Sequence, residues 1–107
     1  MLRKILNLLG IAKPAIDFNN EVKNGALIID VRTKDEYSSG HINGSINIPV
    51  ESLHANISKI KDKDNTIITC CASGMRSASA KHILKSKGFK NVHNGGAWHS
   101  LHRKINK

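Results

Sequence analysis

Two short apolar segments constrain the fold of this chain more than any other feature. Residues 26–31 read ALIIDV and residues 66–70 read TIITC. A strand with a continuous apolar run is buried on both faces, as parallel strands are when helices cover the sheet above and below. The sequence therefore predicts an α/β domain with a mostly parallel central sheet flanked by helices on both faces.

Helical patterns and helix-end signals separate these strands. Thr33 followed by Glu36 forms a capping box, in which each residue caps a backbone N–H of the other. Gly25 and Gly88 supply the left-handed residue that ends many helices. We expect helices at residues 15–24, just after 33, 50–60, 77–87 and 98–107, short strands at 45–48 and 91–93, and a tight turn at 94–96. In such a fold the ligand site lies beyond the carboxyl ends of the strands.

The chain has the length of one compact domain. Its 107 residues are 39% hydrophobic and 23% charged, which is typical of a globular protein. We expect an amphipathic segment at residues 1–14, which packs on the domain or rests on a membrane surface, followed by a domain at residues 15–107. No apolar run approaches the ~20 residues that span a bilayer. We therefore expect no stable membrane insertion, and we expect a monomer.

The two cysteines, Cys70 and Cys71, are adjacent in the chain. Neighbouring residues of a strand point to opposite faces, so we expect no disulfide between them. Free thiols suit a reducing compartment, which favours a cytoplasmic location. Arg3 and Lys4 precede a short apolar stretch that resembles a weak secretory signal, so the periplasm is the alternative.

The charge balance favours anionic partners. Seventeen lysines and arginines against eight acidic residues give a formal net charge of +9. We expect no nucleic-acid binding, because the four aromatic residues do not alternate with the basic ones as a base-stacking surface requires. His99 and His102 lie three residues apart, but without further ligands at suitable spacing we interpret them as a solvated face. We expect neither a metal nor another cofactor.

The most informative segment for function is the loop after the second apolar strand. The strand is predicted to end at Cys70 and the next helix to begin near Ser77, so Cys71 opens a loop that leads into a helix amino terminus. Backbone N–H groups of such a loop point to one place, and together with the positive end of the helix they hold an anion. A cysteine there has a lowered pKa and reacts as the thiolate. Cys71 is therefore the candidate catalytic nucleophile.

The residues after Cys71 form the candidate substrate-binding loop. Small side chains let the backbone curl round a sulfur atom, and a cation at the rim suits a doubly negative substrate such as thiosulfate. The loop residues are Ala72, Ser73, Gly74, Met75 and Arg76. The alternative at this point is that both cysteines are inert core residues and that the arginine is a solvated helix charge.

Four separated sequence elements occur in order along the chain. They are DVR at residues 30–32, GHINGSINIP at 40–49, CASGMRS at 71–77 and GFKNVHNGG at 88–96. Together they resemble the rhodanese-like domain family, over about residues 16–101. The resemblance implies a rhodanese-like fold in which Cys71 forms a persulfide within the backbone of residues 72–76. It also implies that Asp30 and Arg32 hold loops beside the site.

The reaction that this resemblance implies is that of a thiosulfate sulfurtransferase. The Cys71 thiolate attacks the outer sulfur of thiosulfate or of a persulfide donor, and the resulting persulfide passes its sulfur to a thiophilic acceptor. The expected partners are a small anionic sulfur donor and a thiol or protein persulfide acceptor. The residue after the nucleophile is often arginine in this family and is Ala72 here, so one cation near the thiosulfate position is missing.

A second register begins one residue earlier, at Cys70. Five residues separate Cys70 from Arg76, which is the loop spacing of cysteine phosphatases and related arsenate reductases. We favour Cys71 because GMRSASA aligns with the rhodanese loop without a gap, and because Thr69 stands where phosphatases have histidine. A general-acid aspartate beside the loop is also not evident. A non-catalytic sulfide-binding module is the third interpretation.

Overall fold

Helices and strands alternate along the computed structural model, which describes residues 16–106. The strands are β1 Leu27–Asp30, β2 Ile46–Asn47, β3 Thr66–Cys71 and β4 Asn91–Ala97. The α-helices are α2 Phe18–Lys23, α3 Lys34–Ser39, α4 Met75–Ser86 and α5 Trp98–Ile105, and the 3-10 helices are η1 Val50–Ser52 and η2 His54–Lys59. The amphipathic segment predicted at residues 1–14 lies outside the described residues.

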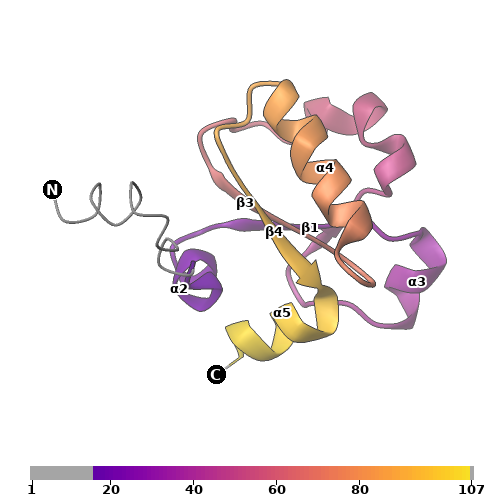
Figure 1. Ribbon diagram of the computed structural model, residues 1–107, viewed down its shortest axis with the longest axis vertical. Helices are drawn as coiled ribbons and strands as arrows, with labels where there is room; N and C mark the ends of the chain where they lie inside the picture. Colours follow the sequence, from indigo (N-terminus) through magenta and orange to yellow (C-terminus); the bar gives the residue numbers. More distant parts are fainter. Residues whose placement is uncertain (1–15, 107) are drawn as a thin grey trace, which may run out of the picture.

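The sheet has four strands in the order β2-β1-β3-β4, and every neighbouring pair is parallel. Helix α4 lies on one side of the sheet, and α2 and α5 lie together on the other (Figure 1). The predicted α/β fold with a parallel sheet covered on both faces is therefore confirmed. The continuous apolar runs are explained by this arrangement, because successive residues of β1 and β3 enter two separate apolar clusters.

The two clusters divide the side chains of the central strands by face. Ile29, Ile67 and Cys71 pack in the cluster that contains Ala80 and Leu84 of α4. Their neighbours in the chain pack in the opposite cluster, beneath α2 and α5; these neighbours are Ile28, Ile68 and Cys70. Strand β3 thus sends adjacent cysteines to opposite faces of the sheet, as the period of two along a strand requires.

The predicted capping box at the start of α3 is confirmed. The Thr33 hydroxyl accepts a hydrogen bond from the Glu36 backbone at 3.2 Å, and the Glu36 carboxylate accepts one from the Thr33 backbone at 3.0 Å. Helix α4 begins at Met75, two residues before the predicted start. Gly74 explains the difference, because it adopts a φ of 101° and so turns the chain directly into the helix.

The segment 50–60 was predicted as one helix and forms the 3-10 helices η1 and η2 instead. Asn56 shows why an α-helix does not form here. Its side-chain amide donates to the Ser52 carbonyl at 2.8 Å, and its backbone N–H donates to Leu53, three residues back, at 3.1 Å. The side chain therefore takes the carbonyl that the α-helical bond would use.

The prediction of a tight turn at residues 94–96 is wrong, because β4 continues to Ala97. The strand passes through an irregularity in its pairing with β3 and resumes opposite Cys71. Gly95 lies so close to β3 that a Cβ atom would come within 2.8 Å of Ile68 and 2.9 Å of the Thr69 carbonyl. Gly95 therefore serves close backbone approach rather than chain reversal.

Candidate active site

The loop between β3 and α4 surrounds the sulfur of Cys71. The Sγ atom accepts hydrogen bonds from the backbone N–H groups of Gly74 at 2.9 Å and Ser77 at 3.4 Å. The Ser77 hydroxyl lies 3.4 Å from the same atom. All these groups belong to the loop or to the first turn of α4, so the local sequence brings the donors to the sulfur. This is the anion-holding arrangement predicted for a loop at a helix amino terminus.

The surroundings of Cys71 have opposing effects on its acidity. Burial raises the pKa of the thiol, because the thiolate loses its hydration. Hydrogen bonds from Ser77, Gly74 and Ser73 lower the pKa, because they stabilise the thiolate. The hydrogen bonds outweigh burial, and the pKa of Cys71 lies below its ordinary value. Since Cys71 is 0% exposed, the donors act on a sulfur that is shielded from water.

Asn94 connects the loop to β4, and the sequence analysis missed it. Its Oδ1 accepts from the Ser77 hydroxyl at 2.6 Å and from the Gly96 backbone at 2.9 Å, and its Nδ2 donates to the Gly74 carbonyl at 3.1 Å. The asparagine was interpreted only as a turn residue. Its position directly after the strand predicted at residues 91–93, where the ligand site of a parallel sheet is expected, is the signal that would have identified it.

The Ser77 hydroxyl has a single proton and two neighbours that accept one. At 2.6 Å, Asn94 is the closer acceptor when Cys71 carries its own proton. When Cys71 is a thiolate, the same proton serves the sulfur only if the hydroxyl turns away from Asn94. The backbone N–H groups of Gly74 and Ser77 have no such competition, so they are the constant donors to the sulfur.

Cys70 lies on the opposite face of the sheet and has a different environment. It packs among apolar side chains, and within residues 16–106 its sulfur takes part in no hydrogen bond. Burial raises the pKa of its thiol to about 12, and the nearby carboxylate of Asp30 adds to the increase. A cysteine in this state is a thiol at any physiological pH and a poor nucleophile.

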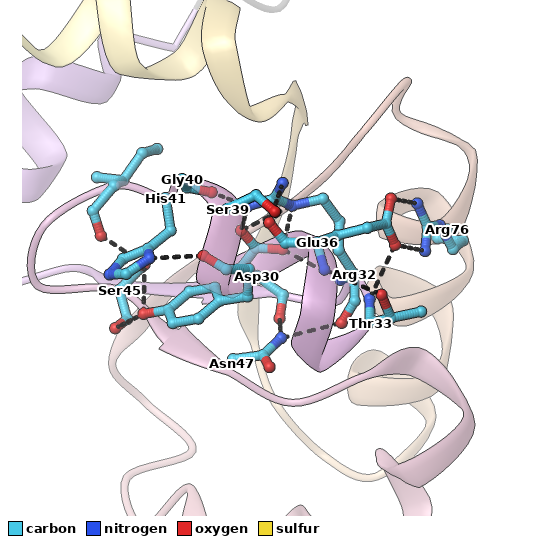
Figure 2. Close-up of polar contacts among 12 residues, drawn as sticks. Asp30, Arg32, Thr33, Glu36, Ser39, Gly40, His41, Ser45, Asn47 and Arg76 are labelled. Carbon is cyan, nitrogen blue, oxygen red and sulfur yellow. Dashed lines mark hydrogen bonds and ion pairs between the residues drawn. The ribbon is translucent and has the colours of Figure 1, made fainter.

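The candidate loop residues differ in exposure and in contacts. Ala72, Ser73 and Met75 are exposed, with Met75 at 79%, while Gly74 and Arg76 are half-buried. The Arg76 guanidinium pairs with the Glu36 carboxylate through contacts of 2.7 and 2.9 Å (Figure 2). The cation at the loop therefore already has an anionic partner from α3, which lies 40 residues earlier in the chain.

Asp30 and Arg32 form a buried ion pair beside this loop. The Arg32 Nη2 atom lies 2.7 Å from Asp30 Oδ2, and the guanidinium also donates to the carbonyls of Glu36 and Gly40 (Figure 2). The Arg32 Cζ atom lies over the Trp98 ring, 4.6 Å from the centroid. The pair thus joins the end of β1 to α3 and to the turn after it, and Arg32 contacts α5.

Two further findings concern ligands and membranes. Among residues 16–106, no group of three or more His, Cys, Asp or Glu side chains is placed to hold a metal ion. In the same part of the chain, every helix is too short or too polar to cross a bilayer.

The fold and the loop define a class of protein, namely a parallel α/β domain with a thiolate-binding loop at a helix amino terminus. A family model, the rhodanese-like domain, matches residues 15–97. The chain therefore belongs to the rhodanese-like domain family, as the four sequence elements indicated.

Relatives of the chain include proteins with sulfurtransferase names. Thiosulfate sulfurtransferase PspE of Escherichia coli is 38% identical over 69 residues, which cover 64% of this chain and 66% of that protein. The tRNA uridine(34) hydroxylase of Buchnera aphidicola is 34% identical over 93 residues, covering 81% of this chain and 30% of that protein. The chain thus matches less than two thirds of the length of these relatives.

Solved structures give the same family. A structure of rhodanese with anions from E. coli is 34% identical and superposes with a TM-score of 0.67, covering 71% of this chain and 91% of that chain. Sulfurtransferase activity is therefore supported at the level of the family.

Proposed function

We propose that this protein is a sulfurtransferase that carries sulfane sulfur as a persulfide on Cys71. The observation that carries the proposal is the set of N–H donors directed at the Cys71 sulfur, which lower the pKa of its thiol despite burial. A thiolate that is stabilised in a dry site is a nucleophile at neutral pH. The sulfurtransferase names of the relatives support the same reaction class.

The reaction has two steps that balance without a cofactor. In the first, the Cys71 thiolate attacks the outer sulfur of a donor such as thiosulfate, the S–S bond of the donor breaks, and sulfite leaves with the bonding electron pair. In the second, a thiophilic acceptor attacks the outer sulfur of the Cys71 persulfide, and the Cys71 thiolate is the leaving group. The acceptor is a thiol, a protein or, in the assay, cyanide.

The loop residues have distinct roles in this proposal. The backbone of Ser73 and Gly74, together with Ser77, stabilises negative charge first on the thiolate and then on the persulfide. Ala72 and Met75 form the exposed rim that a donor meets first. Because Cys71 is 0% exposed, a donor reaches its sulfur only when the groups that cover it move.

We also propose that residues 15–107 form the sulfurtransferase domain and that it works in the cytoplasm. Two free thiols suit a reducing compartment, in which a persulfide is also exchanged with other thiols. Thiosulfate is the donor suggested by the relatives, and a persulfide is the alternative donor.

Steady-state kinetics test this proposal. With thiosulfate as donor and cyanide as acceptor, a covalent intermediate predicts parallel lines in double-reciprocal plots, because sulfite leaves before cyanide reacts. Intersecting lines would contradict the persulfide route. Hydrolysis of an aryl phosphate without sulfur transfer would contradict the reaction class and indicate the phosphatase register at Cys70. Absence of both activities would favour a non-catalytic module.

A further inference from the structure

The cation of the loop that begins at the candidate nucleophile, Arg76, does not have a free charge. Arg76 Nη1 lies 2.7 Å from Glu36 Oε1, and Nη2 lies 2.9 Å from Oε2, so the two groups face each other in parallel (Figure 2). Within residues 71–77, Arg76 is the only lysine or arginine. Ala72, the other position where the family often has a cation, supplies none.

Glu36 is held in this position from its own side as well. Its Oε1 accepts the Thr33 backbone N–H at 3.0 Å, and its backbone carbonyl accepts from Arg32 at 3.2 Å. The hydrogen bonds from Arg76 and then from the Thr33 backbone lower the pKa of Glu36 to about 2. The carboxylate is therefore charged at every pH at which the protein would be assayed, and the oxygen that contacts Arg76 Nη1 also belongs to the capping box.

The pairing matters because donors of sulfane sulfur differ in charge. Thiosulfate is a dianion, so its reaction with the Cys71 thiolate brings three negative charges together and releases sulfite with two of them. A protonated persulfide, R–S–SH, adds no charge to the one on the thiolate. The Cys71 thiolate attacks its outer sulfur, the S–S bond breaks, and the inner sulfur leaves with the electron pair. The proton of the outer sulfur moves to the leaving sulfur, so the products are R–SH and the Cys71 persulfide anion. An unpaired cation at the rim would therefore accelerate the reaction with thiosulfate, because it offsets the repulsion between negative charges. It would not accelerate the reaction with the protonated persulfide.

We propose that Glu36 is a specificity-determining residue, which neutralises Arg76 and so favours donors of the persulfide class over dianionic donors such as thiosulfate. This inference rests on the proposed sulfur transfer through Cys71. The exposed side chain of Met75 at the same rim supplies an apolar contact, which suits an organic persulfide better than an inorganic dianion.

The test compares Glu36→Gln with Asp35→Asn. Both substitutions remove one negative charge from neighbouring positions of α3, but Asp35 is exposed and its side chain does not contact Arg76. Glutamine keeps the capping box, because its side-chain oxygen still accepts the Thr33 N–H. Thermal melts establish that each variant is folded. The two donors are thiosulfate and the persulfide of N-acetylcysteine amide, whose organic group carries no charge and which reacts as R–S–SH. Cyanide is the acceptor.

We expect Glu36→Gln to raise kcat/KM for thiosulfate by roughly three- to tenfold at low salt, mainly through a lower KM, and the gain to fade as salt rises. For the persulfide we expect a change of less than about twofold. Asp35→Asn should leave the ratio of the two donors unchanged. In the double variant Glu36→Gln with Arg76→Gln, the gain for thiosulfate should vanish, because the released cation is absent.

Two kinds of result separate the inference from the function on which it rests. Suppose that the unaltered protein uses both donors. If Glu36→Gln then leaves kcat/KM unchanged for both donors, or raises both values equally, Glu36 does not determine the preference between them. An equal gain in kcat/KM for thiosulfate in Asp35→Asn would also overturn the inference, because the gain would then be an effect of net charge. If the unaltered protein transfers sulfur from neither donor, the proposed function fails instead.

Discussion

Cys70 and Cys71 are neighbours in the chain but lie in two different chemical environments. Both are 0% exposed. Cys70 packs among apolar side chains with the charge of Asp30 nearby, and the pKa of its thiol is raised to about 12. Cys71 receives N–H donors from Gly74 and Ser77, and the pKa of its thiol is lowered. The comparison teaches that burial alone does not decide the reactivity of a thiol, because the donors around the sulfur reverse its effect.

The geometry of β3 produces this difference. A strand alternates its side chains between faces, and the two faces of this sheet are covered by different elements. Cys70 pairs with Asp30 in the register of β1 and β3. Cys71 is the last residue of β3 and meets the amino terminus of α4. A single step along the chain therefore separates an inert thiol from a candidate nucleophile.

Replacing each cysteine should give the largest effect. We expect Cys71→Ser to reduce sulfur transfer by roughly 10³-fold or more, because the persulfide cannot form. We expect Cys70→Ser to retain activity within about threefold, since this sulfur faces the other side of the sheet. The measurement is sulfur transfer to cyanide, with a thermal melt of each variant to establish that it is folded. A severe loss in a folded Cys70→Ser variant alone would reverse the assignment of the two cysteines.

The pH dependence of alkylation should separate the two thiols without a substitution at either. Iodoacetamide reacts with the thiolate, and a lowered pKa means that the thiolate of Cys71 is present at lower pH. Its alkylation should therefore begin well below the ~8.5 of a free thiol. Cys70, with its pKa raised to about 12, should remain a thiol over the same range and react slowly.

Peptide mapping after brief treatment at a series of pH values gives both profiles in one experiment. Equal rates at the two cysteines, with midpoints near that of a free thiol, would contradict the contrast between their environments.

Removing one donor should have the smallest effect. We expect Ser77→Ala to slow the alkylation of Cys71 at neutral pH by roughly three- to tenfold, because a hydrogen bond to the thiolate is lost. The effect stays small because Asn94 competes for the same proton and the backbone donors remain. Ser86→Ala is the matched control, since this exposed serine at the end of α4 bonds only the Ile83 carbonyl. Equal slowing in both variants would show that the Ser77 hydroxyl does not act on the sulfur.

The sequence predicts those parts of the fold that short-range patterns specify. The apolar runs predict β1 and β3, and Thr33 with Glu36 predicts the start of α3, because strand burial and capping depend on residues that are close in the chain. The segment 50–60 has a helical pattern but becomes 3-10 helices, because the Asn56 side chain competes for a backbone carbonyl. Gly95 reads as part of a turn, and only its packing on Ile68 shows that it continues a strand.

In the candidate site, too, the sequence predicts the parts made of consecutive residues and not the parts that other elements contribute. The loop around Cys71 follows from the chain itself, since strand, small residues and helix start are consecutive. Asn94 and Glu36 reach the site from other elements, 20 residues after Gly74 and 40 residues before Arg76. Their contacts depend on how β4 and α3 pack beside the loop, and no pattern of neighbouring residues predicts this packing. The sequence predicts Arg76 as a cation at the rim of the loop, but it does not predict the pairing of Arg76 with Glu36.

The most direct test of the account is the intact mass of the protein after treatment with a sulfur donor. We predict that incubation with thiosulfate or with an organic persulfide, followed by removal of the donor, adds the mass of one sulfur atom. Peptide mapping should place it on Cys71, and subsequent cyanide should remove it. A mass that never changes with either donor, or an added sulfur that maps to Cys70, would contradict the claim that the loop of β3 and α4 holds a persulfide on Cys71.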